Sequence, residues 1–128
     1  MNEPPSSGLQ YAHVNYPALY VFDPTFSYLE TLGWSNIYGQ VDSLAGRLAG
    51  GLSALGLSAV APDAARAGIV SFSVPDADKL VSKLQEKKIY VQERSGLVRI
   101  SPHSYNSETE IDRFVQGLKE ASASLNFL

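Results

Sequence analysis

The chain has 128 residues, enough for one domain with one hydrophobic core, and its 45% hydrophobic and 18% charged residues are typical of globular proteins. The formal net charge of −3 does not favour binding to nucleic acid or to an anionic membrane. The absence of cysteine excludes disulfides, zinc thiolates and cysteine nucleophiles. No apolar run reaches the roughly 20 residues of a membrane span, so a cytoplasmic protein is the simplest expectation.

The first eight residues, MNEPPSSG, are expected to form a disordered tail, and residues 9–128 a single domain. The tail has neither the basic region nor the apolar region of a signal peptide.

Two helices are expected at the front of the domain. Asp23 and Pro24 are typical of a helix start, and Gly33 suits the end of that helix after Leu32. A second helix is expected from Ser35 to Gly56. Its apolar residues are spaced three and four apart and form one helical face: Ile37, Val41, Leu44, Leu48, Leu52 and Leu55. Its internal glycines are expected to serve close packing: Gly46, Gly50 and Gly51.

The remaining sequence predicts short strands alternating with helices. We expect a strand at 57–62, a loop at 63–68 and a strand at 69–74, followed by a helix opened by Pro75 and Asp76. A strand at 89–93, a turn at 94–96 and a returning strand at 97–101 are expected next. The last helix is expected to begin with a capping box at Ser107 and Glu110. From Ile69 onward the order is β-α-β-β-α. This order predicts an α+β domain with two N-terminal helices and helices on one face of a small, mostly antiparallel sheet.

Arg99 is the first candidate for a binding role. If Val98 and Ile100 face the helices, Arg99 points to the opposite face, because side chains alternate along a strand. Its guanidinium group offers a planar fork for a carboxylate or a phosphate. The alternative is a solvent-facing arginine paired with a surface acid, and spacing alone favours that alternative.

The loop after this strand contains three further candidates. His103 could act as a proton-accepting base or stabilise a turn, and the second role is the commoner one. Tyr105 and Asn106 are expected to anchor the loop, with Asn106 helping to cap the last helix. His13 lies in the aromatic stretch 11–17, which packs as a loop or forms the rim of an interface or ligand site.

Common catalytic motifs are absent. The sequence contains no G-x-S-x-G, P-loop, G-x-G-x-x-G or H-E-x-x-H motif. Two histidines far apart in sequence do not indicate a metal site, and no nucleophile has a base nearby. We therefore predict neither a catalytic residue nor a metal site.

The segment VRISPHSYNSETEID resembles the C-terminal part of class V aminotransferases, which are fold-type I pyridoxal-phosphate (PLP) enzymes and include cysteine desulfurases, isopenicillin N epimerase and kynureninase. In that family a strand with R-x-S leads into P-H-x-Y-N-x-x-x-E-I-D. The matching residues are Arg99, Ser101, Pro102, His103, Tyr105, Asn106, Glu110, Ile111 and Asp112. Residues 67–96 resemble the same family's preceding strand, helix and strand, so the resemblance runs from about Leu9 to Leu118.

The resemblance implies roles for particular residues. Arg99 would bind the α-carboxylate of an amino-acid substrate, and His103, Tyr105 and Asn106 would be structural. The family's phosphate-binding E-x-G-T-x-N motif falls on residues 10–15, which imperfectly match it and leave His13 and Asn15 as candidate cofactor contacts. The resemblance also suggests that the first helix begins earlier, near Pro17, with Pro24 as a kink.

The resemblance also implies what this chain lacks. The family's PLP-bearing lysine and most phosphate contacts belong to a large domain that precedes the matching segment. The complete enzyme would hold PLP and form a homodimer, and this chain alone is expected to hold no cofactor. We therefore consider three hypotheses: the C-terminal domain of such an enzyme, inactive alone; a free-standing amino-acid-binding or regulatory module; and a folded remnant with only structural or interaction roles.

Overall fold

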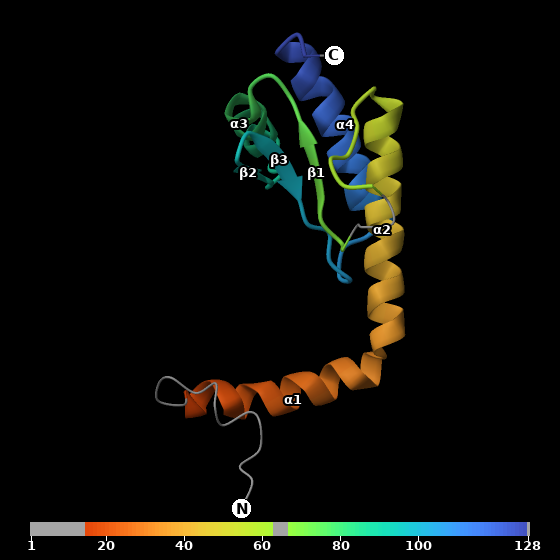
Figure 1. The fold of residues 1–128 in the computed structure, drawn as a ribbon, viewed down its shortest axis with the longest axis vertical. Helices are drawn as coiled ribbons and strands as arrows, with labels where there is room; N and C mark the ends of the chain where they lie inside the picture. Colours follow the sequence, from red (N-terminus) through yellow and green to blue (C-terminus); the bar gives the residue numbers. More distant parts are fainter. Residues whose placement is uncertain (1–14, 63–66, 128) are drawn as a thin grey trace, which may run out of the picture. The chain divides into compact units, whose positions relative to one another are not determined.

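A computed structural model of the chain describes residues 15–62 and 67–127. The chain divides into two compact units, residues 1–34 and residues 35–128, which we describe separately (Figure 1). The expected tail at residues 1–8 and the candidate His13 lie outside the described residues.

The first unit contains helix α1 (Tyr16–Leu32). Asn15 caps it, because the Asn15 side chain accepts a hydrogen bond from the Ala18 backbone N–H at 3.2 Å, and a proline follows in the first turn. The predicted start at Asp23 is therefore wrong, and the earlier start near Pro17 is confirmed. Pro24 lies inside the helix, and Gly33 ends it with φ at 81°.

Helix α1 has no buried residue. Its aromatic side chains contact one another: the rings of Phe22 and Phe26 stack with centroids 5.8 Å apart, and the ring centroid of Phe26 lies 6.2 Å from that of Trp34. Its exposed large hydrophobic residues are Tyr16, Leu19, Tyr20, Val21, Phe22, Phe26, Tyr28 and Leu32. This helix therefore contributes nothing to a buried core.

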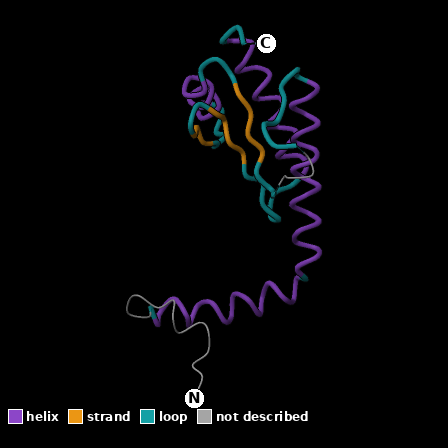
Figure 2. Tube along the Cα trace, in the orientation of Figure 1, coloured by secondary structure: helices purple, strands orange, loops and turns teal. Residues whose placement is uncertain are grey.

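The second unit is an α+β domain in the predicted order. Helix α2 (Trp34–Ala54) leads into it, and strand β1 (Val70–Ser73), helix α3 (Ala77–Glu86), strands β2 (Gln92–Arg94) and β3 (Leu97–Ile100), and helix α4 (Glu108–Ser124) follow. The three strands form one antiparallel sheet in the order β1-β3-β2 (Figure 2). Strand β3 is therefore central, with a hydrogen-bonded neighbour on each side.

Two predicted strands differ from the observed ones. The strand at 57–62 is wrong, because this segment makes only an isolated bridge between Ala59 and Phe72, and Pro62 cannot donate to a continued ladder. The strand predicted at 89–93 begins later, at Gln92. Ile89 instead donates its N–H to the Leu84 carbonyl at the end of α3, so the chain joins the ladder only after this cap.

Helices α2, α3 and α4 supply one core together with one face of the sheet. Its fully buried side chains include Leu48 from α2, Leu80 from α3, Leu118 from α4, and Phe72 and Val98 from the sheet. The opposite face of the sheet is not covered by any helix described in this unit (Figure 1). The unit thus has one covered face and one open face, as the alternation of β3 predicted.

None of the helices that the structure describes has the length and hydropathy needed to traverse a bilayer.

Candidate functional site

Arg99 lies on the open face of the sheet, in the central strand. Its neighbours Val98 and Ile100 are 0% and 8% exposed, which confirms the predicted alternation. Arg99 faces Ser71 across β1 and Gln92 across β2. Arg99 is only partly exposed, because a strand flanks it on each side. In an edge strand, one side of its aliphatic stem would be exposed.

Among the described residues, no acid forms an ion pair with Arg99 and no group forms a hydrogen bond with its guanidinium group. Residues 15–62 and 67–127 therefore contain no partner of the kind that the structural alternative requires. Arg99 lines an open hollow of about 510 Å³ with Gln85, Tyr90, Val91, Gln92 and Ser101. An arginine with unused donors beside an open hollow can bind a planar anion through two hydrogen bonds.

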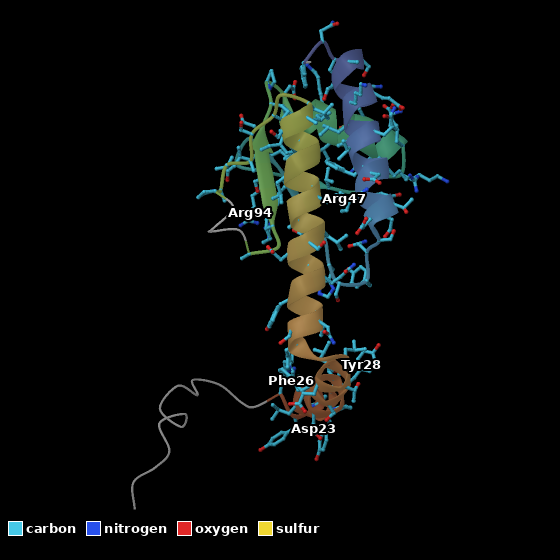
Figure 3. The ribbon with its side chains drawn as sticks, turned by 90° about the vertical axis from the view of Figure 1, so that its right-hand side faces the viewer. Asp23, Phe26, Tyr28, Arg47 and Arg94 are labelled. Atoms are coloured by element: carbon cyan, nitrogen blue, oxygen red, sulfur yellow. The ribbon has the colours of Figure 1, made fainter. Side chains whose placement is uncertain are left out.

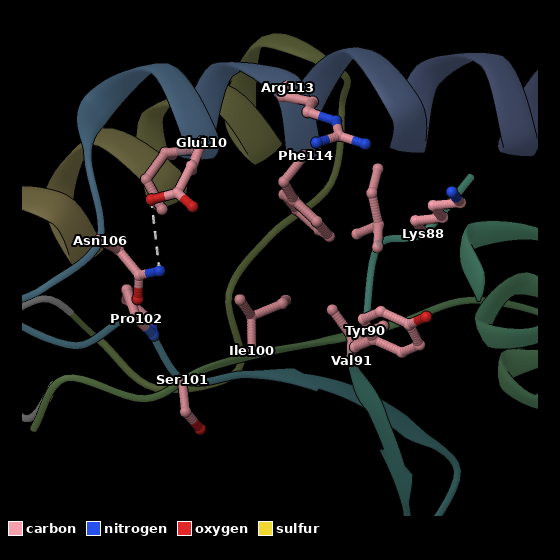
Figure 4. A pocket seen from close by; sticks show the side chains of 12 residues that line it. Lys88, Tyr90, Val91, Ile100, Ser101, Pro102, Asn106, Glu110, Arg113 and Phe114 are labelled. Carbon is pink, nitrogen blue, oxygen red and sulfur yellow. Dashed lines mark hydrogen bonds between the residues drawn. The ribbon is translucent and has the colours of Figure 1, made fainter.

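A second hollow, of about 290 Å³, lies between α4 and the segment that precedes β2. It shares Tyr90, Val91 and Ser101 with the first hollow, and its floor is apolar because Ile100 and Phe114 point into it (Figure 4). Arg99 does not line this hollow. We therefore assign this hollow no part in the candidate site.

The loop after β3 is held by Asn106. The side-chain oxygen of Asn106 accepts a hydrogen bond from the His103 backbone N–H at 2.9 Å, and its backbone N–H donates to the His103 carbonyl at 2.9 Å. The rings of His103 and Tyr105 stack with centroids 4.7 Å apart, and both residues are exposed. This geometry is what a structural role requires, and that role stays a prediction for these three residues.

The capping box joins this loop to α4. The Glu110 carboxylate accepts a hydrogen bond from the Ser107 backbone N–H at 2.8 Å, and the Ser107 hydroxyl accepts one from the Glu110 N–H at 3.3 Å, as predicted. The pKa of the Glu110 carboxyl is lowered by three hydrogen bonds, from the Ser107 backbone N–H, the Asn106 side chain and the Ser107 hydroxyl. Figure 4 shows the bond from Asn106. Hydrogen bonds of Asn106, Ser107 and Glu110 therefore hold the loop between β3 and α4.

Asp112, the last residue of the E-I-D motif, binds a residue that the sequence analysis did not single out. Arg47 of α2 donates from Nε to Asp112 Oδ1 and from Nη2 to Asp112 Oδ2, both at 2.7 Å, and its Nη1 lies 3.0 Å from Glu108 Oε2. The hydrogen bond and the charge of Asp112 raise the pKa of Arg47, and Arg47 lowers that of Asp112. The contact crosses between helices far apart in sequence, so no local pattern marked it.

The candidate cofactor contacts are His13 and Asn15. His13 lies outside the described residues. Asn15 belongs to the first unit, where its side-chain oxygen caps α1. Among the described residues no group of three potential metal ligands is found.

Comparisons with known proteins extend these observations. No family model matches the sequence, and no curated protein matches it. Among solved structures, a cysteine desulfurase from Thermococcus onnurineus NA1 in its apo form matches with a TM-score of 0.80 and 26% identity over 94% of this chain. A NifS-like protein matches with a TM-score of 0.60 and 28% identity over 73%, and a cystine C-S lyase solved with cysteine persulfide with a TM-score of 0.60 and 28% identity over 66%.

This chain spans only part of those proteins: 34%, 29% and 24% of their respective lengths. The matches agree with the motif around Arg99 and with the α+β order of the second unit. The chain therefore resembles the C-terminal, small-domain part of class V aminotransferases, which are fold-type I PLP enzymes.

Proposed function

We propose that this chain is the C-terminal domain of a PLP-dependent class V aminotransferase-like enzyme that acts on an amino acid. In this role Arg99 binds the substrate α-carboxylate, and a large domain supplies the cofactor and its lysine. The complete enzyme would be a homodimer. The chain alone would not catalyse the reaction.

The observation that carries the proposal is the position of Arg99. It lies on the open face of the sheet, beside a hollow, with no acid bound to it among the described residues. A planar fork held by a strand fixes both the position and the rotation of a carboxylate, so the amine of a bound amino acid points in one direction.

The residues of this chain fit a carboxylate and do not fit PLP. PLP needs a lysine to form a Schiff base. Three lysines form ion pairs: Lys79 with Asp76, Lys83 with Glu86, and Lys87 with Glu120. Lys88 and Lys119 are exposed, and neither lines the hollow of Arg99. In the proposed enzyme, the lysine therefore comes from another part of the protein.

Helix α1 supports the same proposal. A helix with exposed aromatic side chains and no buried residue is costly in water unless another surface covers it. This chain covers only 34% and 29% of two of the matched structures, so those proteins contain segments that this chain does not.

A second candidate is a free-standing module that binds an amino acid without a cofactor. The self-contained core of the second unit favours it, because α2, α3, α4 and the sheet bury their apolar faces against one another. Arg99 would bind a carboxylate in this case too. The exposed apolar surface of α1 favours the first candidate over this one.

The carboxylate role can be tested on the chain itself. We would follow the arginine Nε–Hε signals by NMR during titration with L-alanine, and with L-alaninamide as the matched ligand that lacks the carboxylate. L-alanine should shift the Arg99 signal and L-alaninamide should not. Arg99→Gln should abolish the response, whereas Arg113→Gln on α4 should retain it. Equal shifts with both ligands, or an unmoved Arg99 signal, would contradict the carboxylate role.

A further inference from the structure

A second arginine lies on the open face of the sheet close to Arg99. Arg94 is the last residue of β2 and pairs with Leu97, while Gln92, two residues earlier, pairs with Arg99. Because side chains two residues apart on a strand share a face, Arg94 points to the same side as Gln92 and Arg99. Figure 3 shows Arg94 on the side of the unit that lies away from α4.

The register sets the separation of the two arginines. Arg94 is diagonal to Arg99 across the β2–β3 pair, a relationship that places backbones about 7–8 Å apart. Both side chains are long enough to reach one ligand between them. Gln92 lies beside Arg94 and opposite Arg99, and its amide adds a donor to the same surface.

The nearest acid does not neutralise this pair. Glu93 alternates to the opposite face of β2, and its carboxylate accepts a hydrogen bond from the Gly96 backbone N–H at 2.6 Å. Among the described residues, Arg94 forms no ion pair or hydrogen bond through its side chain. Two like charges on neighbouring strands repel each other, and a bound anion between them removes that cost.

The two positive charges stand out because the chain as a whole has a net charge of −3. The other described arginines have partners: Arg47 binds Asp112, and Arg113 donates to the Lys87 carbonyl at 3.3 Å. Among the described residues, Arg94 and Arg99 have no such partners, and both lie on the open face of the sheet.

We propose that Arg94 binds a second anionic group of the substrate, so that the site selects an amino acid with an acidic side chain. This inference rests on the proposed function, because Arg99 must bind the α-carboxylate. Arg94 and the Gln92 amide then bind the side-chain acid. One arginine recognises any amino acid, and the second adds selectivity for dianionic ones.

Binding of small acids to the whole chain tests this inference. We would titrate it with L-aspartate, L-glutamate, L-asparagine and L-alanine at constant ionic strength and follow backbone amide signals of β2 and β3 by NMR. The acidic amino acids should bind at least about 10-fold more tightly than asparagine and alanine, a preference worth about 1.4 kcal/mol. Arg94→Gln should remove the preference and leave alanine binding unchanged.

Two further variants, Arg113→Gln and Arg99→Gln, separate the possible failures. Arg113→Gln is the matched loss of an arginine on α4, and it should keep the preference. If acidic and neutral amino acids bind equally while Arg99→Gln abolishes both, the role of Arg94 is wrong and the proposed function stands. If Arg99→Gln leaves all binding unchanged, the proposed function itself fails.

A phosphate group is the other dianion that two arginines could bind. Titration with inorganic phosphate therefore accompanies the amino acids. Phosphate binding that is tighter than aspartate binding, and that persists in Arg99→Gln, would assign Arg94 to a phosphate and overturn the substrate inference.

Discussion

Arg47 and Asp112 form a two-pronged ion pair between α2 and α4, with both N–O distances at 2.7 Å. The pair joins the helix that enters the second unit to the helix that begins just after the candidate site. Both acids of the E-I-D motif therefore have a structural role. Glu110 closes the capping box at the start of α4, and Asp112 binds Arg47. The presence of these two acids is thus explained by their contacts as well as by the family resemblance.

Breaking this pair should loosen the contact between α2 and α4. Arg47→Gln and Asp112→Asn should each lower the midpoint of urea unfolding, and the double variant should lose less than the sum of the two, because both changes remove the same contact. Lys119→Gln, which removes a charge from α4 outside this pair, is the control. Additive losses would show that the two residues act independently.

The carboxylates of Glu110 and Asp112 should make the fold sensitive to acid. Both have pKa values lowered in the folded state, Glu110 chiefly by the Ser107 N–H and Asp112 chiefly by Arg47. A lowered folded pKa contributes stability above the unfolded pKa, and this stability is lost as the pH falls through the folded pKa. The urea midpoint should therefore be level near neutrality and fall below about pH 4, the usual carboxylate range.

The double variant Glu110→Gln, Asp112→Asn should show a shallower fall over the same range. An identical pH profile in the variant and in the parent chain would contradict this assignment.

Adjacent glycines in α2 should respond oppositely to alanine. A Cβ atom at Gly51 would lie 2.5 Å from Val115 Cγ2, whereas one at Gly50 would meet nothing within 4 Å. Gly50→Ala should stabilise the helix by up to about 1 kcal/mol, because alanine favours helices. Gly51→Ala should destabilise the chain by about 1 kcal/mol or more, because Val115 is stiff and must move. Urea unfolding measures both, and the same sign for both variants would contradict the packing argument.

Arg99→Ala should leave the stability of the chain nearly unchanged. The arginine is partly exposed and binds no acid among the described residues, so its removal leaves no buried charge unpaired. Chemical denaturation should give a difference below about 1 kcal/mol. A loss above about 2 kcal/mol would reveal a buried, paired arginine with a structural role.

The chain alone should not form a specific aldimine with PLP. Absorbance spectra with and without PLP, together with the mass after borohydride reduction, measure this directly. We expect no aldimine band and no stoichiometric adduct, because no lysine lines the hollow beside Arg99. A one-to-one adduct on one lysine would show that the chain holds cofactor by itself and would overturn the assignment of that lysine to another domain.

Local patterns predicted the second unit well. Helical periodicity located α2, the Ser107 and Glu110 box located α4, and alternation placed Val98 inward and Arg99 outward. The same alternation failed at residues 57–62, because a short apolar run cannot reveal whether a neighbouring strand is available for pairing. The glycines of α2 were predicted to serve close packing, which Gly51 does and Gly50 does not.

The candidate site depends on information that is not local. Arg47 and Asp112 meet only after folding, and the diagonal between Arg94 and Arg99 depends on the register of a hairpin. The start of α1 was ambiguous because Asp23 with Pro24 and Asn15 with Pro17 both resemble helix starts. Resemblance favoured the correct start, and propensity alone did not.

The turn between β2 and β3 has a wider consequence. Ser95 and Gly96 adopt positive φ angles of 55° and 79°, and this two-residue connection fixes which residues of the two strands face each other. An inserted or deleted residue between the turn and Arg99 would reverse the alternation of β3. It would bring the guanidinium group into the hydrophobic core and turn Val98 to the solvent. The length of this hairpin therefore keeps the candidate binding residue Arg99 and the core residue Val98 on opposite faces of the same short strand.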